Sequence, residues 1–377
     1  MNLLSSLRRT LFSLGCLLVG SFQFGCWQHS PSQAIPPITH AYVTNLGTHT
    51  VSVIDLNLFK NVKTISVGRS PDRIVAHPTK ELLFAANLES ASISVIDSRT
   101  QAVKKNLTVG KNPTDIVFSP DGLWAYVACY GANQVTVIDC QALTVTRNIK
   151  TQRGPAALQL APSRNELWIA HQVDNTVAVL DLQSYTFTDS LSMPKGPFGL
   201  VLLPDQSKLF VGSMGSDTVS VIDVSQRKLN PPLFPGKIPL HLIMKPDGGE
   251  IYVNNFDAES VVIINTATSE LNGKFTVGKN PMGSAISSDG SRLYVANRGS
   301  NTVSVLDPPN GRQVLASLAV GAEPETVALT PDDLFLFVLN TGSSDVSVIR
   351  TDLIQAGNNA LYAVIPTGVS PASIAMK

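Results

Sequence analysis

Three residues whose side chains could bind charge or move a proton each stand two positions after a proline. They are Arg73, Asp115 and His241. An arginine guanidinium can hold a carboxylate or a phosphate through two parallel hydrogen bonds, and histidine titrates near neutral pH. If the fold brings these side chains together, they predict a site for a small polar or anionic ligand. The alternative is an ion pair between Arg73 and Asp115 beside a solvated His241.

Two carboxylates extend this candidate site. Glu323 and Glu325 flank Pro324, in the same sequence context as the residues near the other prolines. Paired carboxylates act as general acid and base in many enzymes. A solvated loop is the simpler interpretation of the pair, and both residues remain candidates for ligand binding.

Metal ligands of the soft or borderline kind occur at Cys129 and His171, 42 residues apart. A closed structural zinc site needs four ligands, and no third ligand is apparent in the sequence. We therefore predict no bound metal. His77 occupies a turn position where other repeats carry Ser, Ala or Thr, and we expect its side chain to be exposed.

The elements that carry these residues repeat about every 42 residues. Segments that resemble "YVTN" end at Asn45, Asn87, Cys129, His171, Ser213, Asn255, Asn297 and Asn340. Segments that resemble "VSVID" end at Asp55, Asp97, Asp139, Asp181, Asp223, Asn265, Asp307 and Arg350. Prolines recur at Pro71, Pro113, Pro155, Pro197, Pro239, Pro281, Pro324 and Pro371. Eight copies of each element predict one structural unit that is built eight times.

Each unit reads as four short strands. In residues 113–152, the stretches "PTDIVFSP", "WAYVAC", "VTVID" and "TVTRNIK" are rich in β-branched and apolar residues, and turn-forming residues separate them. Helical periodicity is missing, and several strands are apolar on both faces. Four-stranded antiparallel sheets repeated in this way predict an all-β propeller.

The order of the strands predicts how the ring closes. The repeats begin at the second strand of a unit, "AYVTN", and end with a lone first strand, "PASIAMK". A unit with two apolar faces is stable only between neighbours, so the last strand should complete the first unit. This count gives eight blades. Seven is the alternative if one unit, most naturally the last, is irregular.

Residues that repeat in every blade are predicted to be structural. The Asp column should bond N–H groups of the following turn, the Asn column should tolerate positive φ or cap a hairpin, and the prolines should fix φ at the start of the inner strand. The position two after each proline should face the central channel. Around the ring it reads Arg73, Asp115, Ala157, Gly199, His241, Gly283, Thr326 and Ser373.

The motifs "YVTN", "YVAN", "NTVSVID", "VGKNP" and "SPDG" resemble those of YVTN-repeat β-propeller proteins, which include surface-layer and exported bacterial proteins. The resemblance covers nearly the whole chain from His40 onward and implies the propeller fold. It transfers no catalytic residue, because the shared motifs are the structural ones. Relatives with similar blades include lactonase-type propellers and the heme- or quinone-linked propellers of periplasmic oxidoreductases.

Residues 1–34 have the layout of a secretion signal: a charged start "MNLLSSLRRT", an apolar run "LFSLGCLLVGSF" and the small-residue stretch "SPSQA". Cleavage after Ala34 would leave a single propeller domain of residues 35–377. The stretch "FQFGC" offers lipid attachment at Cys26 as the alternative. Either route predicts export to the periplasm or the cell surface.

Two cysteines, Cys129 and Cys140, lie within the repeats. They fall near opposite ends of the two strands of one hairpin, which is too far apart for a disulfide. We therefore predict two buried free thiols.

Charge and motifs narrow the functional classes. Lys plus Arg and Asp plus Glu number 28 each, so no basic excess favours nucleic acid. The sequence has no C-x-x-C-H or H-E-x-x-H motif, no Gly-x-Ser-x-Gly elbow and no Gly-rich phosphate loop ahead of a helix. We predict no cofactor.

The leading hypothesis is an exported, monomeric cell-envelope propeller that acts as a binding scaffold without catalysis, because rigid blades present variable loops. Its partner would be an envelope protein or a small polar or anionic ligand, and it would touch the membrane only through a lipid anchor. One alternative is a lactonase-type hydrolase that acts on a sugar or muconate lactone at the channel mouth. Another is an accessory protein of a periplasmic redox system.

Overall fold

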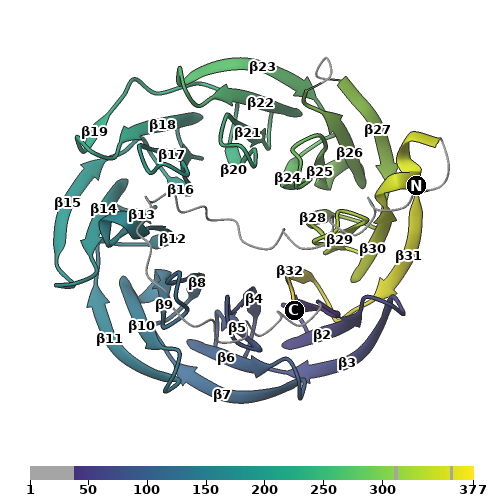
Figure 1. Ribbon diagram of the computed structural model, residues 1–377, viewed down its shortest axis with the longest axis horizontal. Coiled ribbons are helices and arrows are strands. Elements are labelled where there is room, and N and C mark those ends of the chain that lie inside the picture. Colours follow the sequence, from purple (N-terminus) through teal and green to yellow (C-terminus); the bar gives the residue numbers. More distant parts are fainter. Residues whose placement is uncertain (1–37, 310–312, 357–359) are drawn as a thin grey trace, which may run out of the picture. The chain divides into compact units, whose positions relative to one another are not determined.

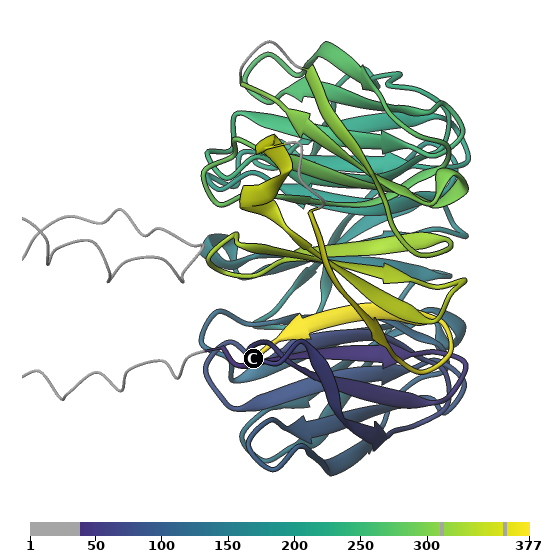
Figure 2. The same ribbon diagram turned by 90° about the vertical axis from the view of Figure 1, so that its right-hand side faces the viewer.

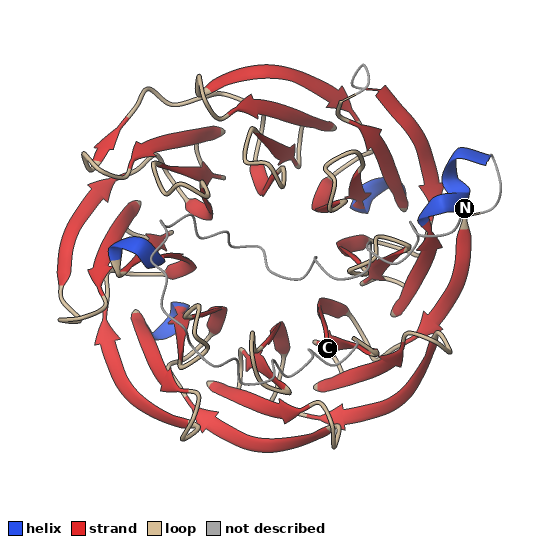
Figure 3. Ribbon diagram, in the orientation of Figure 1, coloured by secondary structure: helices blue, strands red, loops and turns tan. Residues whose placement is uncertain are grey.

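A computed structural model describes residues 38–309, 313–356 and 360–377, which belong to one compact unit. The predicted signal of residues 1–34, with the lipidation candidate Cys26, lies outside the described residues. The described chain is all-β apart from short 3₁₀ helices (Figure 3). None of the helices in these ranges has the length and hydropathy of a membrane span.

The strands fall into four sets, named from the channel outward. The inner strands are β4 (Pro71–Ala76), β8 (Pro113–Phe118), β12 (Pro155–Ala161), β16 (Pro197–Leu202), β20 (Pro239–Met244), β24 (Pro281–Ile286), β28 (Pro324–Leu329) and β32 (Pro371–Met376). The second strands are β1 (His40–Asn45), β5 (Leu82–Asn87), β9 (Trp124–Cys129), β13 (Glu166–His171), β17 (Lys208–Ser213), β21 (Glu250–Asn255), β25 (Leu293–Asn297) and β29 (Phe335–Asn340).

The third strands are β2 (Thr50–Asp55), β6 (Ser92–Asp97), β10 (Gln134–Asp139), β14 (Thr176–Asp181), β18 (Thr218–Asp223), β22 (Ser260–Asn265), β26 (Thr302–Asp307) and β30 (Asp345–Arg350). The outer strands are β3 (Lys60–Ser66), β7 (Ala102–Thr108), β11 (Thr144–Lys150), β15 (Phe187–Ser192), β19 (Lys228–Leu229), β23 (Glu270–Thr276), β27 (Gln313–Ala319) and β31 (Leu361–Pro366). The 3₁₀ helices are η1 (Tyr130–Ala132), η2 (Pro162–Arg164), η3 (Arg298–Ser300) and η4 (Thr351–Ala356).

These strands form eight four-stranded antiparallel sheets, which stand as blades around a ring (Figure 1). We number the blades from 1, which holds β32, β1, β2 and β3, to 8, which holds β28 to β31. Every blade after the first takes its four strands in chain order. The prediction of eight blades is therefore confirmed, and the seven-blade alternative is wrong.

Blade 1 joins the two ends of the described chain. β32 pairs antiparallel with β1, with Met376 opposite Ala41. The N–H of Ser373 also donates to Oγ1 of Thr44 at 3.0 Å. Figure 2 shows β32, in yellow, beside the purple strands of this blade. The last strand completes the first blade, as the order of the repeats predicted.

Apolar side chains are buried between blades. Eight hydrophobic clusters occur among the described residues, and each joins two neighbouring blades. Phe84 of blade 2 packs with Ile116 of blade 3, and Phe337 of blade 8 packs with Ala41 of blade 1. Each blade depends on both neighbours for its core, which is the physical reason for a closed ring.

The proline and aspartate columns behave as predicted. A proline begins each of the eight inner strands. Oδ1 of Asp55 accepts the N–H groups of Asn57 and Leu58 at 2.8 Å each, and Asp97 bonds its own turn in the same way. These carboxylates replace the backbone acceptors that a tight turn cannot supply.

The positive-φ interpretation of the asparagine column is wrong. The asparagines of this column end strands and have negative φ, and positive φ falls four residues later, as at His49. The buried side chain of Asn45 donates to Oγ1 of Thr50 at 3.0 Å and to Oγ of Ser52 at 2.9 Å. Asn45 therefore joins the two strands of its hairpin from within.

Cys129 and Cys140 are buried free thiols, as predicted. Cys129 ends β9, and Cys140 follows the paired strand β10. Burial raises the pKa of both thiols, that of Cys140 to about 12. Neither thiol is poised for chemistry at neutral pH.

Candidate functional site

One face of the ring is built from the loops before the inner strands and the hairpins that follow the second strands. In blade 2 the N–H of Leu88 donates to the carbonyl of Ser70 at 2.9 Å, and in blade 1 the N–H of Leu46 donates to the carbonyl of Ser370 at 3.0 Å. The first residues of the inner strands lie just inside this face. We call this end of the channel the mouth.

Arg73 of β4 and Asp115 of β8 form an ion pair across neighbouring blades. Nη2 of Arg73 lies 3.5 Å from Oδ1 of Asp115. Asp115 also accepts two backbone N–H groups, from Ile116 at 3.0 Å and from Leu158 at 2.9 Å. Burial raises the pKa of Asp115, although the Arg73 charge and these N–H groups oppose that shift. The side chain of Arg73 is 51% exposed, so most of its five N–H donors remain open to the channel.

His241 of β20 lies on the opposite side of the ring from Arg73 (Figure 1). Its Nδ1 lies 3.0 Å from Oγ of Ser284 in the next blade. Burial lowers the pKa of His241 to about 4, and the Arg73 charge adds to this shift. Within the described chain, no hydrogen bond joins His241 to Arg73. His241 is a half-buried, neutral side chain and not the solvated histidine of the alternative interpretation.

Glu323 and Glu325 both pair with Arg298, a residue that the sequence patterns did not single out. Nη2 of Arg298 lies 2.6 Å from Oε2 of Glu323, and its Nε lies 2.9 Å from Oε1 of Glu325. Arg298 opens η3 in the hairpin of blade 7, whereas both glutamates belong to blade 8. Arg298 partly neutralises the two carboxylates and holds them at the mouth, where the side chain of Glu323 stays 50% exposed.

Asp72 adds a further carboxylate at the mouth. It lies between Pro71 and Arg73, where the pairing of β4 with β5 shifts register. Burial raises the pKa of Asp72, the Arg73 charge lowers it, and the charge of Glu325 raises it. Sequence patterns missed Asp72 because only the position two after each proline was expected to face the channel.

The two candidate metal ligands do not meet. Sγ of Cys129 lies 3.5 Å from Oγ1 of Thr136, and Nδ1 of His171 lies 3.4 Å from Oγ1 of Thr176. Both residues are fully buried, and burial lowers the pKa of His171 to about 4. In residues 38–309, 313–356 and 360–377, no three His, Cys, Asp or Glu side chains gather into a possible metal site.

The prediction that His77 is exposed is wrong, because its side chain is only 1% exposed. Its Nε2 lies 2.8 Å from the carbonyl oxygen of Gly122 in blade 3, and its Nδ1 accepts the N–H groups of Thr79 and Lys80 at 3.2 and 3.0 Å. The turn that carries His77 packs against the corresponding turn of the next blade. Burial there lowers the pKa of His77.

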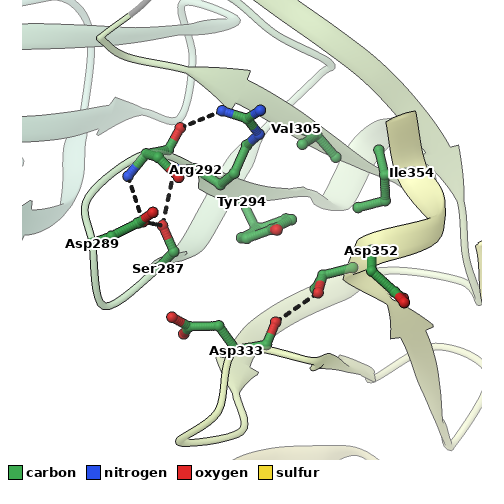
Figure 4. A pocket seen from close by; sticks show the side chains of 10 residues that line it. Ser287, Asp289, Arg292, Tyr294, Val305, Asp333, Asp352 and Ile354 are labelled. Atoms are coloured by element: carbon green, nitrogen blue, oxygen red, sulfur yellow. Dashed lines mark hydrogen bonds between the residues drawn. The ribbon is translucent and has the colours of Figure 1, made fainter. Parts of the chain in front are cut away.

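The opposite face contains two pockets that the sequence patterns did not mark. A cavity of about 250 Å³ lies between blades 7 and 8 (Figure 4). Its walls are Ser287, Asp289, Ser291, Arg292, Tyr294, Val305, Asp333, Thr351, Asp352 and Ile354. A more open pocket of about 510 Å³ lies between blades 5 and 6. There Nζ of Lys208 donates to the carbonyls of Thr266 and Ala267 at 2.8 Å each and to Oγ of Ser269 at 2.9 Å, so its three N–H donors are already used.

Comparison with known proteins agrees with this architecture. The model of the seven-bladed lactonase β-propeller family matches residues 100–231 and 199–358, which together cover more than half of the chain. A YNCE-like β-propeller model matches residues 9–142. Among curated proteins, no significant match was found.

Several solved structures share the fold. Hydrazine synthase of Kuenenia stuttgartiensis is 24% identical with a TM-score of 0.60, over 74% of this chain and 95% of that one. The dihydro-heme d1 dehydrogenase NirN, in complex with DHE, is 14% identical with a TM-score of 0.75, over 93% and 77%. A functionally unknown protein of Desulfotomaculum acetoxidans is 16% identical with a TM-score of 0.62, over 78% and 98%. At these identities the likeness shows the fold alone. The family match and the ring of four-stranded blades together show that the chain belongs to the lactonase-type β-propeller family, with eight blades where that family is described with seven.

Proposed function

We propose that the protein is a binding propeller that holds a small hydroxylated acid at the channel mouth without converting it. The observation that carries this proposal is the half-exposed guanidinium of Arg73, whose one ion pair among the described residues is the 3.5 Å contact with Asp115. Its remaining donors can take a carboxylate in two parallel hydrogen bonds.

The charges around Arg73 favour one class of acid. Asp72, Glu323 and Glu325 bring negative charge to the mouth, and Arg298 offsets only part of it. A ligand with two negative charges would be repelled more strongly than one with a single charge. The same carboxylates can accept hydrogen bonds from hydroxyl groups. A singly charged sugar acid fits both requirements better than inorganic phosphate does.

The arrangement supports binding more than catalysis. His241 faces the channel from the opposite side of the ring, and Ser284 holds one of its ring nitrogens. Glu323 and Glu325 are tied to Arg298. A general base must lie within hydrogen-bond reach of the reacting group while the electrophilic clamp holds the substrate. Neither His241 nor the glutamate pair meets this condition beside Arg73.

Calorimetric titration tests the proposal with gluconate, sorbitol and phosphate as probes. We expect gluconate to bind and sorbitol, which lacks the carboxylate, to bind at least about tenfold more weakly. Arg73→Ala should remove gluconate binding. The matched control is Arg153→Ala on the same face, because Arg153 is 68% exposed and pairs with Asp174 at 2.7 Å. Equal affinities of wild type and Arg73→Ala for gluconate would end the proposal.

Lactone hydrolysis is the second candidate, and two observations favour it. The family match names lactonases, and Asp72 lies next to Arg73 with a pKa that burial raises. In this case Arg73 would polarise the lactone carbonyl and Asp72 would activate water. The test follows the opening of a sugar lactone and of a muconate lactone over the buffer rate. If the protein accelerates lactone opening and Asp72→Asn abolishes this acceleration, lactone hydrolysis replaces ligand binding as the proposed function.

The cellular setting remains part of the proposal and rests on the sequence alone. The layout of residues 1–34 supports export, with cleavage after Ala34 or lipid attachment at Cys26. The working partner would then be an envelope protein or a small ligand that contacts the loops of a monomeric propeller. Labelled fatty-acid incorporation into the wild type and into Cys26→Ser separates the two export routes.

A further inference from the structure

The cavity between blades 7 and 8 contains a tyrosine hydroxyl that no described residue bonds. Tyr294 is 3% exposed and lines this cavity. Tyrosines at the same position in other blades are satisfied within the protein. The hydroxyl of Tyr42 donates to the carbonyl of Ser98 at 3.0 Å, and that of Tyr252 donates to Oε2 of Glu250 at 2.7 Å. The Tyr294 hydroxyl lies at the end of a buried ring, lines the cavity and makes no hydrogen bond within the described residues, so its donor is available to an occupant of the cavity.

Two carboxylates in the same cavity are bonded by hydroxyl and backbone N–H groups, and neither forms an ion pair within the described residues. Oδ1 of Asp289 accepts the hydroxyl of Ser287 at 2.6 Å and the N–H of Ser291 at 2.8 Å. Oδ2 of Asp333 accepts the N–H of Ser288 at 2.8 Å and its hydroxyl at 2.5 Å. The hydroxyl of Ser291 also bonds the Asp289 carboxylate, whereas Oδ1 of Asp333 has no partner in the part of the chain that the structure describes.

Asp333 carries a charge that its structural role does not need. It stands in a turn at φ 58°, where the equivalent residues Gly122 and Gly290 also have positive φ. Gln206 holds the same place in blade 5, and its Oε1 accepts the N–H and the hydroxyl of Ser163 in the preceding blade. The contact between blades is therefore made by a neutral amide in blade 5. The negative charge of Asp333 is therefore not needed for the contact between blades and is available to bind a cation.

The charges that surround the cavity leave a negative excess. Asp352 is paired with Arg350 through both oxygens, at 2.9 and 3.1 Å. Nη1 of Arg292 lies 3.4 Å from Oδ1 of Asp307. These pairs cancel, whereas the donors to Asp289 and Asp333 are hydroxyl and backbone N–H groups. The cavity therefore selects for a positive charge near Asp289 and Asp333.

We propose that this cavity binds a small organic amine. Its ammonium group would lie between Asp289 and Asp333, and a hydroxyl or other polar group would meet the free hydroxyl of Tyr294. The apolar side chains of Val305 and Ile354 would cover its hydrocarbon part, which a bare metal ion lacks. In Figure 4 the labelled side chains surround the ring of Tyr294, with Asp289 and Asp333 on one side of it and Val305, Ile354 and Asp352 on the other.

The cavity exists because blade 8 departs from the repeat. Other blades join the third strand to the outer strand by a short turn, whereas blade 8 inserts η4 between β30 and β31. η4 supplies Thr351, Asp352 and Ile354 to the wall. Thr351 is fixed by its hydroxyl, which donates to the carbonyl of Asp333 at 2.6 Å. The irregular unit thus adds a wall that a regular blade could not provide.

Saturation-transfer NMR with the purified full chain tests the proposal, using two amines and their amine-free analogues. The pairs are ethanolamine with ethylene glycol and glucosamine with glucose. We expect a saturable signal from at least one amine and none from its analogue. Asp333→Asn should weaken amine binding about tenfold, because it removes a charge and keeps an acceptor for Ser288. Tyr294→Phe should weaken it about fivefold.

Three further measurements keep the result decisive. Tyr42→Phe removes a hydroxyl at the same position of blade 1 and should leave amine affinity unchanged. Asp289→Asn gives an independent reading if Tyr294→Phe does not fold. Equal signals from amines and their analogues, no signal from either amine, or displacement of the amine by equimolar calcium chloride would each overturn the proposal.

Discussion

Arg73 and Asp115 meet at 3.5 Å across the boundary between blades 2 and 3, although they occupy the same position of successive repeats. The contact shows what the position two after each proline does. Asp115 bonds the N–H of Leu158 in the next blade at 2.9 Å, and in the same way Oγ of Ser373 accepts the N–H of Ile74 at 3.3 Å. Asp115 and Ser373 each accept an N–H of the neighbouring inner strand, whereas Thr326 donates to the carbonyl of Ala372 at 2.8 Å. The side chain of Arg73 is 51% exposed, so part of its guanidinium is open to a ligand in the channel.

Asp115→Asn should strengthen gluconate binding at the mouth by about threefold. Asparagine keeps one oxygen for the N–H of Ile116 or Leu158 but no longer competes for the guanidinium of Arg73. The gain is small because a half-exposed ion pair contributes less than about 1 kcal/mol. Calorimetric titration of both proteins measures it, and weaker binding by Asp115→Asn would contradict the role given to Arg73.

Asp115→Ala separates stability from binding at the same position. It leaves the N–H groups of Ile116 and Leu158 without their acceptor. We expect the free energy of unfolding to fall by about 1–3 kcal/mol, the cost of unsatisfied buried donors. Urea denaturation of Asp115→Asn and Asp115→Ala side by side provides the measurement. Equal losses in the two variants would show that the backbone contacts of Asp115 carry little stability.

The protein should lose stability as the pH falls below about 6.5. Burial lowers the pKa of His171 from 6.5 to about 4, so between these values the unfolded chain binds a proton that the folded chain does not. The stability that His171 contributes is complete above pH 6.5 and declines as the pH approaches 4, by up to about 1.4 kcal/mol per pH unit. His241 acts in the same direction.

His171→Asn should flatten part of this decline, since it places the column asparagine of other blades opposite Thr176. Urea midpoints at pH 7.5 and pH 5 give the slope for each protein. Ser213→Asn is the matched control, because it introduces asparagine at the same position of blade 5 without removing a histidine. An unchanged pH slope in His171→Asn would show that His171 is protonated in the folded state.

The fold could be predicted because its determinants are local and repeated. The prolines mark the start of every inner strand. The lone strand "PASIAMK" at the end of the chain has no partner in its own repeat, which predicts that it pairs with β1. Binary patterning then leaves one way to bury both faces of each sheet. His77 shows the limit of this reasoning. The sequence of a single repeat predicts that the turn with His77 is exposed. The side chain is buried because the turn packs against the next blade.

The candidate site could be predicted only in part, because its contacts cross blade boundaries. The spacing of the prolines brought Arg73 and Asp115 together. It could not reveal Arg298, whose guanidinium reaches from blade 7 to two glutamates of blade 8. Asp72 was missed because strand alternation was expected to point it away from the channel. Tyr294 was missed for another reason. Tyrosine recurs at this position in several blades and is therefore expected to be structural, and Tyr294 differs only in that no described residue bonds its hydroxyl.

The internal thiols should be inert in the folded protein. Burial raises the pKa of Cys140 to about 12 and also that of Cys129, and both side chains are almost fully buried. With Cys16 and Cys26 replaced by serine, we expect Ellman's reagent to titrate no thiol in the native protein and both in urea. Rapid reaction of either thiol in native buffer would mean that blade 3 opens locally.

Removal of residues 371–377 should abolish the cooperative melt or lower the melting temperature by more than about 10 °C. Without β32, the edge of β1 is unpaired and Ala41 and Val43 lose their cover, so the ring has an open seam between blades 8 and 2. Deletion of Lys377 alone is the control. It removes the contact of Nζ with the carbonyl of His77 at 2.9 Å and the backbone bonds of Lys377 with Thr39 and His40, and it keeps β32. Calorimetry compares the three chains, and the shorter protein should also bind a dye for exposed apolar surface. A sharp, wild-type transition in the chain that lacks β32 would mean that the seam contributes nothing to cooperativity and that the blades hold together pairwise.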